Sequence, residues 1–451
     1  MRWKSKQIVL VAAGLCTLVP VCFAAADAAK FRSAGPDAVP DRWIVLLEEA
    51  AVGGPAGQAA GPQRVRELAL DLGRIFGLEV ERTWGHAVNA FLVTAPEPAA
   101  RRLARHPFVA IVEPDVHVAA AVPNCYTGTT FPSNGRALPS SSDFQSQAIS
   151  CSDPATSCVD NWGIDRIDQR SLPRDGSYSW GLNGTGVYVY VLDTGINYHY
   201  EFRDHFGLQR LERGLGVNTT VPVGHADRGD STDDLGHGTH VAGILGGRTY
   251  GVAKDVHIVP VKVFVGGGGD VSYLIDGIDF VRAQQGEYGW EAVATLSANS
   301  SAWRLNTTLV TAVQNLIGAG VQLVQSAGNQ ASQHSCTYSL GGVTDALVVG
   351  GTTVADQRWS GSNFGTCVDL FAPAADVFSS YAGTDDGFEK RYCELTGTSM
   401  AAPHVAGALA IYLESASYTP GQLRGLVLGD ATAGALGGLG TGSPNLLLYV
   451  P

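Results

Sequence analysis

The stretch Gly397-Thr398-Ser399-Met400-Ala401-Ala402-Pro403-His404-Val405-Ala406-Gly407 brings a serine to the start of a predicted apolar helix. Apolar residues recur at helical spacing from Val405 to Leu413. Pro403 suits a first helical turn, where its missing N–H costs nothing. Ser399 is therefore expected beside unpaired backbone N–H groups, at the positive end of the helix dipole. Taken alone, such a serine is a helix cap, so any further role depends on the rest of the chain.

The composition indicates a globular protein with a large core. A length of 451 residues favours two domains over one. Apolar residues make up 45%, charged residues 16%, and 56 residues are glycine, which is typical of a tightly turned α/β or β-rich protein. The formal net charge of −12 argues against nucleic acid or an anionic membrane as a partner.

Residues 1–29 are predicted to be a signal peptide. They combine a basic start, an apolar run from Ile8 to Phe23 and the cleavage pattern Ala24-Ala25-Ala26. The run is short for a membrane span, so we expect a secreted, extracellular protein with no span after signal removal. Outside the signal, an even set of cysteines implies disulfides whose connectivity the sequence leaves open: Cys125, Cys151, Cys158, Cys336, Cys367 and Cys393.

Residues 30–120 predict a small α+β domain. Strands are expected at 42–47, 78–82, 90–93 and 109–112, with helices at 65–76 and 98–106. The order β-α-β-β-α-β is that of a ferredoxin-like fold. The segment has no cysteines and no aromatic stacking residues in a basic setting, which disfavours a metal-binding or RNA-binding module.

Residues 121–160 are predicted to be a cysteine-containing extension, and residues 161–451 a second domain. Buried strands are expected at 187–192, 256–264, 321–325, 346–349 and 368–371, with helices such as 273–284 and 308–319 between several of them. This alternation predicts an α/β fold with a mostly parallel sheet and helices on both faces.

Three residues of the second domain could form a hydrolytic triad. Asp193 follows the strand Val187–Leu192, and active sites gather at the carboxyl ends of parallel strands. His237 opens a helix, and Ser399 opens another. The serine would attack, the histidine would carry the proton, and the aspartate would orient the imidazole. Asn329, after a further strand, could donate its amide to the oxyanion, and losing such a donor costs roughly 3–4 kcal/mol.

Each of these residues also has a simpler interpretation. Asp193 could form only a turn before Thr194-Gly195. His237 and His240 could instead bind a metal, although the Glu or Cys ligands of a zinc-protease helix are missing from this pattern.

The four motifs together resemble the subtilisin-like serine proteases (peptidase S8 family), specifically the proteinase K-like subfamily. The motifs are Asp193-Thr194-Gly195, His237-Gly238-Thr239-His240-Val241-Ala242-Gly243, Ser326-Ala327-Gly328-Asn329 and Gly397–Gly407, in the order of that family. The resemblance implies that Asp193, His237 and Ser399 are the triad, that Asn329 completes the oxyanion hole, and that catalysis needs no cofactor. Residues 41–118 resemble the family's inhibitory propeptide (inhibitor I9 type), which implies a zymogen that cleaves itself near Ala119–Ala121.

The resemblance also implies a cleft that binds protein or peptide substrates by strand addition. Its expected residues are Gly268 and Gly269 on the edge strand, Ser297, Ala298 and Asn299 on the second segment, and Ala327 and Gly328 at the pocket for the residue before the scissile bond (P1). Where the family has Ser-Leu-Gly-Gly, this chain has Ser297-Ala298-Asn299-Ser300. We expect a monomer of broad specificity that favours small or apolar P1 residues.

Two further features are carried over from the family. A structural calcium is expected on the carbonyls of Leu340 and Gly342 and the carboxylate of Asp356, oxygen ligands that suit Ca²⁺; an ordinary surface turn is the alternative. Cys336 and Cys367 resemble a disulfide of the bacterial secreted members.

Two other functions remain as rivals. A processing protease that prefers basic P1 residues would need carboxylates near the pocket, and Ser326-Ala327-Gly328 offers none locally. A non-catalytic binding protein on the same fold is suggested only by the altered segment Ser297–Ser300.

Overall fold

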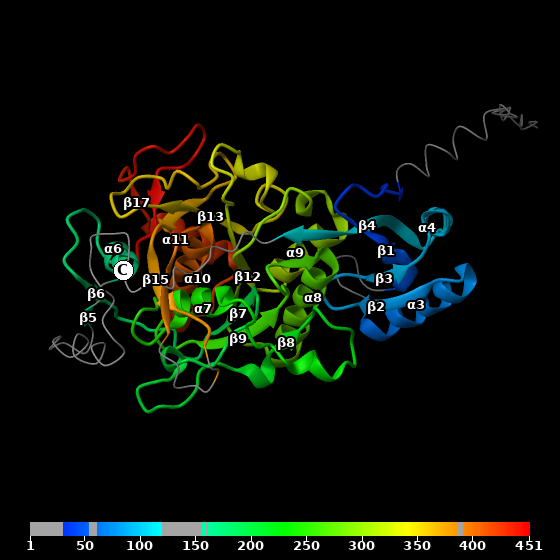
Figure 1. Cartoon of the computed structure of the whole chain (residues 1–451), viewed down its shortest axis with the longest axis horizontal. Coiled ribbons are helices and arrows are strands. Elements are labelled where there is room, and N and C mark those ends of the chain that lie inside the picture. The colour runs from blue at the N-terminus through cyan, green and yellow to red at the C-terminus, as the bar shows by residue number, and fades with distance from the viewer. Residues whose placement is uncertain (1–29, 54–60, 120–155, 159–160, 384, 386–390) are drawn as a thin grey trace, which may run out of the picture.

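The computed structural model describes residues 30–53, 61–119, 156–158, 161–383, 385 and 391–451. The predicted signal peptide and most of the predicted extension 121–160 lie outside these residues. Figure 1 shows a smaller N-terminal unit, drawn in blue to cyan, beside a larger body that runs from green to red.

The larger body is built on a nine-stranded sheet of order β17-β18-β14-β13-β12-β11-β7-β9-β8. Every neighbouring pair from β18 to β8 is parallel, and β17 pairs antiparallel with β18. The strands are β7 (Tyr188–Asp193), β8 (Val217–Asn218), β9 (His257–Lys262), β11 (Ala292–Leu296), β12 (Gln322–Ser326), β13 (Leu347–Thr352), β14 (Leu370–Pro373), β17 (Thr432–Ala433) and β18 (Leu446–Leu447).

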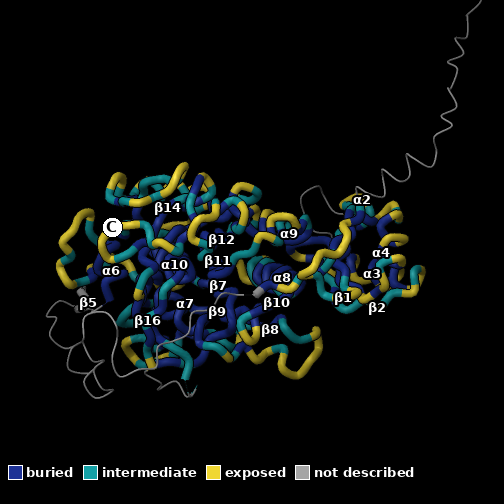
Figure 2. Tube along the Cα trace, turned by 45° about the horizontal axis from the view of Figure 1, so that its top comes forward, coloured by how far each residue is buried: buried dark blue, intermediate teal, exposed yellow. Residues whose placement is uncertain are grey.

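Helices cover both faces of this sheet, because its strands are apolar on both sides. Val189 and Val191 of β7 pack with α7 (His237–Gly246) and α10 (Thr398–Ser415) on one face. Tyr190 and Leu192 pack with α8 (Val271–Tyr288) and α9 (Thr307–Gly318) on the other. The predicted α/β class with a mostly parallel sheet and helices on both faces is confirmed. Figure 2 shows these central elements as the most buried part of the chain.

The N-terminal unit is an antiparallel sheet of order β4-β1-β3-β2 with two main helices. Its elements are β1 (Ala38–Leu47), α2 (Glu49–Val52), α3 (Pro62–Phe76), β2 (Glu79–Trp84), β3 (Ala90–Thr94), α4 (Glu97–Ala104) and β4 (Val109–Ala119). Trp43 and Val45 of β1 face α3 and α4. The opposite face, with Ile44 and Trp84, packs on α8 and α9 of the larger body.

Strand β4 is longer than the sequence pattern predicts. The pattern ends this strand at Val112, because Glu113-Pro114-Asp115 has the composition of a turn. In the structure β4 continues to Ala119 and leaves the N-terminal unit to pair antiparallel with β10 (Gly268–Asp270) of the larger body. Pairing with a partner far along the chain therefore overrides the local turn signal.

Shorter elements complete the larger body. They are α6 (Trp162–Ile167), α11 (Pro420–Asp430), β5 (Thr156–Cys158), β6 (Ser177–Ser179), β15 (Val377–Ser380), β16 (Tyr392–Leu395) and the 3₁₀ turns η1 (Tyr200–Phe202), η2 (Arg213–Leu215), η3 (Ala226–Gly229), η4 (Trp303–Leu305) and η5 (Ser335–Thr337). Among the described residues, none of the helices has both the length and the apolar composition needed to cross a bilayer.

Glycines let α7 and α10 lie close together beneath the sheet. A Cβ on Gly407 of α10 would stand 2.9 Å from the carbonyl oxygen of Leu245 on α7 and 2.7 Å from Cβ of Val252. Neither neighbour can move far, because one is helix backbone and the other is fully buried.

Replacing Gly407 by alanine should therefore lower stability. We expect Gly407→Ala to cost about 1–3 kcal/mol through overpacking, which thermal unfolding would show as a lower melting temperature. The matched control is Gly425→Ala on α11, where a Cβ meets nothing within 4 Å. That change should be neutral or raise stability by up to about 1 kcal/mol, the difference in helix propensity. A melting temperature for Gly407→Ala at or above that of the control would contradict the close packing.

Candidate active site

Asp193 and His237 are in direct contact, although 44 positions separate them in the chain. Asp193 is the last residue of β7 and His237 the first of α7. His237 Nδ1 lies 2.7 Å from Asp193 Oδ1, and both side chains are buried. Gly238 makes this approach possible, since a Cβ there would stand 2.1 Å from the carbonyl oxygen of Gly195.

The environment of His237 suits a proton carrier. Burial alone would lower the pKa of His237, but the charge of Asp193 and the hydrogen bond to it outweigh burial and raise the pKa above its ordinary value. Nε2, the second ring nitrogen, is buried and has no hydrogen-bond partner among the described residues. The imidazole therefore has one nitrogen fixed by a carboxylate and the other open to receive a proton.

His240 does not join His237 in a metal site. Its Nε2 lies 3.1 Å from the carbonyl oxygen of Val377 and 3.0 Å from that of Cys393. Burial lowers the pKa of His240 to about 3, which keeps the ring neutral inside the core. The metal pair weighed from the sequence is thus replaced by a structural histidine that ties α7 to β15 and β16.

Ser399 lies in the first turn of α10, where its hydroxyl donates to the carbonyl oxygen of Ser297 at 2.9 Å. The hydroxyl of Ser297 in turn donates to the carbonyl oxygen of Ser399 at 3.0 Å. In this conformation Ser399 Oγ is hydrogen-bonded to the carbonyl of Ser297 and not to His237. Catalytic hydrogen bonds often form only when substrate binds.

Pro403 explains why Ser297 is needed here. The sequence places Pro403 in the first turn of the helix, but α10 begins at Thr398, so Pro403 lies inside it. Without an N–H, Pro403 cannot bond the carbonyl four residues earlier, which is that of Ser399. The Ser297 hydroxyl satisfies this carbonyl instead. The prediction for Pro403 was wrong because helix ends are poorly marked in an apolar stretch.

Asn329 faces the same turn. Its Oδ1 accepts from Thr398 N at 2.9 Å and from Thr398 Oγ1 at 2.7 Å. Its Nδ2 lies 3.3 Å from the point where a Cβ on Gly397 would stand. The side chain is thus oriented with its amide N–H₂ beside the segment that carries Ser399. Sequence reasoning missed Thr398 as the residue that orients Asn329, although its place next to the serine was a signal.

The segments expected to form the substrate cleft also meet. A Cβ on Gly328, whose φ is +105°, would stand 2.8 Å from Asn299 Oδ1. Gln330 Nε2 donates to Asn299 Oδ1 at 3.3 Å, and Asn363 Nδ2 donates to Gln330 Oε1 at 2.7 Å. Three amides therefore line one side of Gly328. Sequence reasoning missed Gln330 and Asn363, because only the fold brings them to this loop.

The other residues of the predicted cleft follow β11 and β12 or lie on β10. Ala298 and Ala327 are buried, and the carbonyl of Ala298 accepts from Gln325 Nε2 at 3.1 Å. Gly268 and Gly269 lie on β10, opposite Ala119 and Val118 of β4. The edge strand is thus paired with a segment of the N-terminal unit.

The residues expected to hold calcium do not fit a cation. The carboxylate of Asp356 is bound on both oxygens by the Arg166 guanidinium, at 2.8 and 3.0 Å. The carbonyl oxygen of Leu340 accepts from the backbone N–H groups of Val343 and Thr344 and from the Thr344 hydroxyl. Gly342 lies against Cys367, since a Cβ there would be 2.8 Å from its Sγ. The one carboxylate of the set is ion-paired with an arginine, and the Leu340 carbonyl is already hydrogen-bonded within its own turn.

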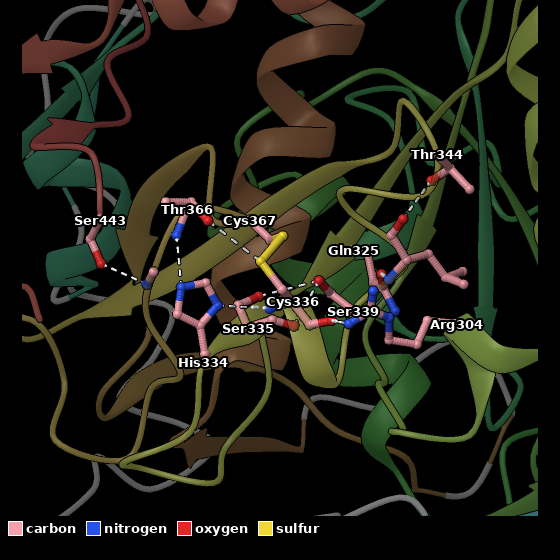
Figure 3. Close-up of a disulfide and its surroundings, with 12 residues drawn as sticks. Arg304, Gln325, His334, Ser335, Cys336, Ser339, Thr344, Thr366, Cys367 and Ser443 are labelled. Atoms are coloured by element: carbon pink, nitrogen blue, oxygen red, sulfur yellow. Dashed lines mark hydrogen bonds between the residues drawn. A yellow bond between two sulfur atoms is a disulfide. The ribbon is translucent and has the colours of Figure 1, made fainter. Parts of the chain in front are cut away.

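Cys336 and Cys367 form the predicted disulfide, with their Cα atoms 5.1 Å apart (Figure 3). It joins η5 to the loop that leads into β14. Next to it, the His334 ring lies between two backbone N–H groups, with Nδ1 3.4 Å from Cys336 N and Nε2 3.3 Å from Thr366 N. A neutral imidazole can accept only one of these two hydrogen bonds at a time. Cys125 and Cys151 lie outside the described residues.

Comparisons with known proteins agree on one family. Residues 184–443 match the model of the subtilase family, peptidase S8. An extracellular serine proteinase of Thermus sp. (strain Rt41A) is 36% identical over 454 residues, which cover 98% of this chain and 97% of that protein. Alkaline serine exoprotease A of Vibrio alginolyticus is 33% identical over 417 residues, covering 91% of this chain and 68% of that protein.

A solved structure gives the same result. The crystal structure of a cold adapted subtilisin-like serine proteinase superposes with a TM-score of 0.55 at 40% identity, covering 64% of this chain and 98% of that one. The family match, the two relatives and the shared fold lead to one conclusion: the chain belongs to the subtilase family and is a subtilisin-like serine protease.

Proposed function

We propose that the chain is a secreted serine endopeptidase of the proteinase K-like subfamily, made as a self-processing zymogen. The observation that carries the proposal is the 2.7 Å contact between Asp193 and His237, with the second imidazole nitrogen open. That arrangement is what a histidine needs in order to act as a general base for a nearby hydroxyl.

The proposed reaction uses side chains and water, with no cofactor. Ser399 Oγ leaves the Ser297 carbonyl and attacks the substrate carbonyl as His237 Nε2 takes its proton. Asp193 holds the imidazole in orientation and stabilises its charged form. The oxyanion is met by the Asn329 amide and by backbone N–H groups at the start of α10. Collapse releases the amine with the proton from His237, and water then hydrolyses the acyl-enzyme by the same route.

The N-terminal unit is proposed to be the inhibitory propeptide, with a ferredoxin-like fold of the I9 type. Its element order and its sheet order support this assignment. The pairing of β4 with β10 supports its role, because proteases that bind peptides by strand addition are blocked by a strand that already occupies the edge. In this scheme residues 1–29 direct export, residues 121–160 begin the mature enzyme, and cleavage falls near Ala119–Ala121. The enzyme is proposed to act on protein or peptide substrates as a monomer.

Two carboxylates of β4 support a second role for the unit, as a template. Glu113 accepts from Thr307 N at 3.0 Å and Thr308 N at 2.8 Å, at the start of α9. Asp115 accepts from Ser272 N at 3.0 Å, at the start of α8. Negative side chains at helix N-termini satisfy backbone donors that would otherwise be unpaired. The unit thus stabilises the two helices that it covers.

The self-processing part of the proposal is tested by the intact mass of the secreted protein. Wild type should lose everything before roughly Ala121, whereas Ser399→Ala should keep its propeptide because no nucleophile remains. The matched control is Ser301→Ala, an exposed serine on a turn, which should mature normally. Processing of Ser399→Ala to the wild-type mass would assign maturation to another protease.

Labelling by a serine-directed fluorophosphonate gives an independent test of the nucleophile. Mature wild type should be labelled at Ser399, and a protein that only binds peptides should not be. Absence of label on a correctly folded mature chain would contradict the catalytic assignment.

The pH dependence follows from the environment of His237. Because Asp193 raises the pKa of His237 above 6.5, the ring is protonated at a higher pH than a free imidazole. A protonated ring cannot accept the serine proton, so kcat/KM should fall as the pH drops through that raised pKa. A pH–rate profile on a peptide substrate measures this limb. If kcat/KM fell only below pH 6.5, Asp193 would not be raising the pKa of His237.

Asn299 is proposed to favour small P1 residues. The Asn299 side chain lies beside Gly328 and is hydrogen-bonded to Gln330. The family has a glycine at the position of Asn299, and therefore no side chain there. Asn299→Gly should raise kcat/KM for substrates with Phe or Leu at P1 relative to Ala by about tenfold, the scale of a steric change in an apolar pocket. Ser301→Gly in the same loop is the control and should leave the ratio unchanged. An unchanged ratio in Asn299→Gly would place the P1 limit elsewhere.

A further inference from the structure

A contact between two side chains crosses the strands that join the N-terminal unit to the larger body. In the antiparallel pair of β4 and β10, His117 stands directly opposite Asp270. His117 Nδ1 lies 2.9 Å from Asp270 Oδ1. The His117 side chain is 60% exposed, while the Asp270 side chain is only 9% exposed. A buried carboxylate on the edge strand therefore meets a side chain of the strand that lies along it.

Asp270 depends on the N-terminal unit for its cationic partner, Arg42, and for its contact with His117. Its second oxygen, Oδ2, accepts from Arg42 Nη1 of β1 at 2.8 Å. Among the residues that the structure describes, no cation from the larger body is ion-paired with Asp270. Departure of the N-terminal unit would remove both partners together and leave a carboxylate at the edge of the cleft without a counter-charge.

We propose that Asp270 selects substrates with a cationic side chain at the strand position that His117 occupies. In sequence terms this is two residues before the residue that pairs with Gly268. The inference rests on the proposed function, because it takes β4 as the stand-in for a bound substrate strand. The substrate class is an extended peptide with Arg, Lys or a protonated His at that position.

Backbone pairing fixes which substrate side chain reaches Asp270. Gly268, Gly269 and Asp270 pair in register with Ala119, Val118 and His117, respectively. Side chains alternate along a strand, and Val118 is buried in the core with Phe264 and Leu274. The side chain of His117, which precedes Val118, must therefore point to the opposite face, toward Asp270. Cross-strand pairs of opposite charge are favourable at this spacing.

The side chain at the position of His117 crosses Gly268, which has no side chain to block its path. The His117 ring lies over Gly268, since its Nε2 is 2.9 Å from the point where a Cβ on Gly268 would stand. A guanidinium or ammonium group on a longer stem can follow the same path across the glycine. A substrate carboxylate at this position would face Asp270 and be repelled.

The inference is tested with mature enzyme and a set of peptides based on residues 114–124 of this chain. The peptides differ only at the position of His117, which is replaced by Arg, Gln or Glu. Wild type should cleave them in the order Arg, Gln, Glu, with kcat/KM for Arg about fivefold above Gln at low salt, the scale of a partly exposed ion pair. The difference should shrink at high ionic strength, because salt screens exposed charges.

Variants separate a local contact from the general charge of the protein. Asp270→Asn should abolish the preference for Arg over Gln while keeping cleavage of the Gln peptide. Glu287→Gln removes the same charge from an exposed position at the far end of α8 and should keep the preference. If Asp270→Asn fails to mature, the inference is still tested by how fast wild type cleaves the Arg and Gln peptides at low and at high ionic strength.

The outcomes distinguish this inference from the function on which it rests. Equal cleavage of the Arg and Gln peptides by wild type, or a preference that persists in Asp270→Asn, overturns the role of Asp270 and leaves the protease assignment intact. Failure to cleave any of the peptides, with Ser399 unlabelled by fluorophosphonate, overturns both.

Discussion

The hydrogen bond between His237 and Asp193 is the constraint on which the arrangement of the candidate active site depends. It requires the start of α7 to lie against the end of β7, closer than a side chain on Gly238 would allow. Asp233 holds the two elements in place, because its carboxylate accepts from the hydroxyls of Thr194 and Thr239 at 2.7 and 2.6 Å. These contacts are buried, where a missing partner would be costly. The geometry of the proposed base, His237, is therefore built into the core.

At the interface with the N-terminal unit, burial opposes the ionisation of two carboxylates, while hydrogen bonds and an arginine favour it. Asp115 is fully buried, and burial raises its pKa to about 6 against the effects of Ser272 and Arg42, which favour the charged form. Burial likewise raises the pKa of Glu113. Carboxylates that resist ionisation in a complex weaken it as the pH rises, since the free unit can ionise them more easily. These two carboxylates therefore make the packing of the N-terminal unit on α8 and α9 dependent on pH.

Much of the fold and of the site could be predicted from local patterns. Apolar runs such as Val187–Leu192 mark strands that are buried on both faces, and their alternation with helices fixes a parallel sheet. Asp193 could be placed because active residues gather where such strands end. The errors arose where long-range contacts override local signals: β4 passes through Pro114 to reach β10, and Pro403 lies inside α10 because Ser297 satisfies the carbonyl that it leaves unpaired.

The sequence by itself determined the α/β class, the identity of the triad candidates and the family, because these depend on periodicity and on short motifs within continuous stretches. Only the tertiary structure decided which distant groups meet. In the structure, Arg166 binds the carboxylate of Asp356, which was expected to hold calcium. Gln330 is hydrogen-bonded to Asn299, and His117 lies opposite Asp270. The physical reason is that charge pairing and hydrogen bonding act over a few ångströms in space, and separation along the chain does not reveal which groups come that close.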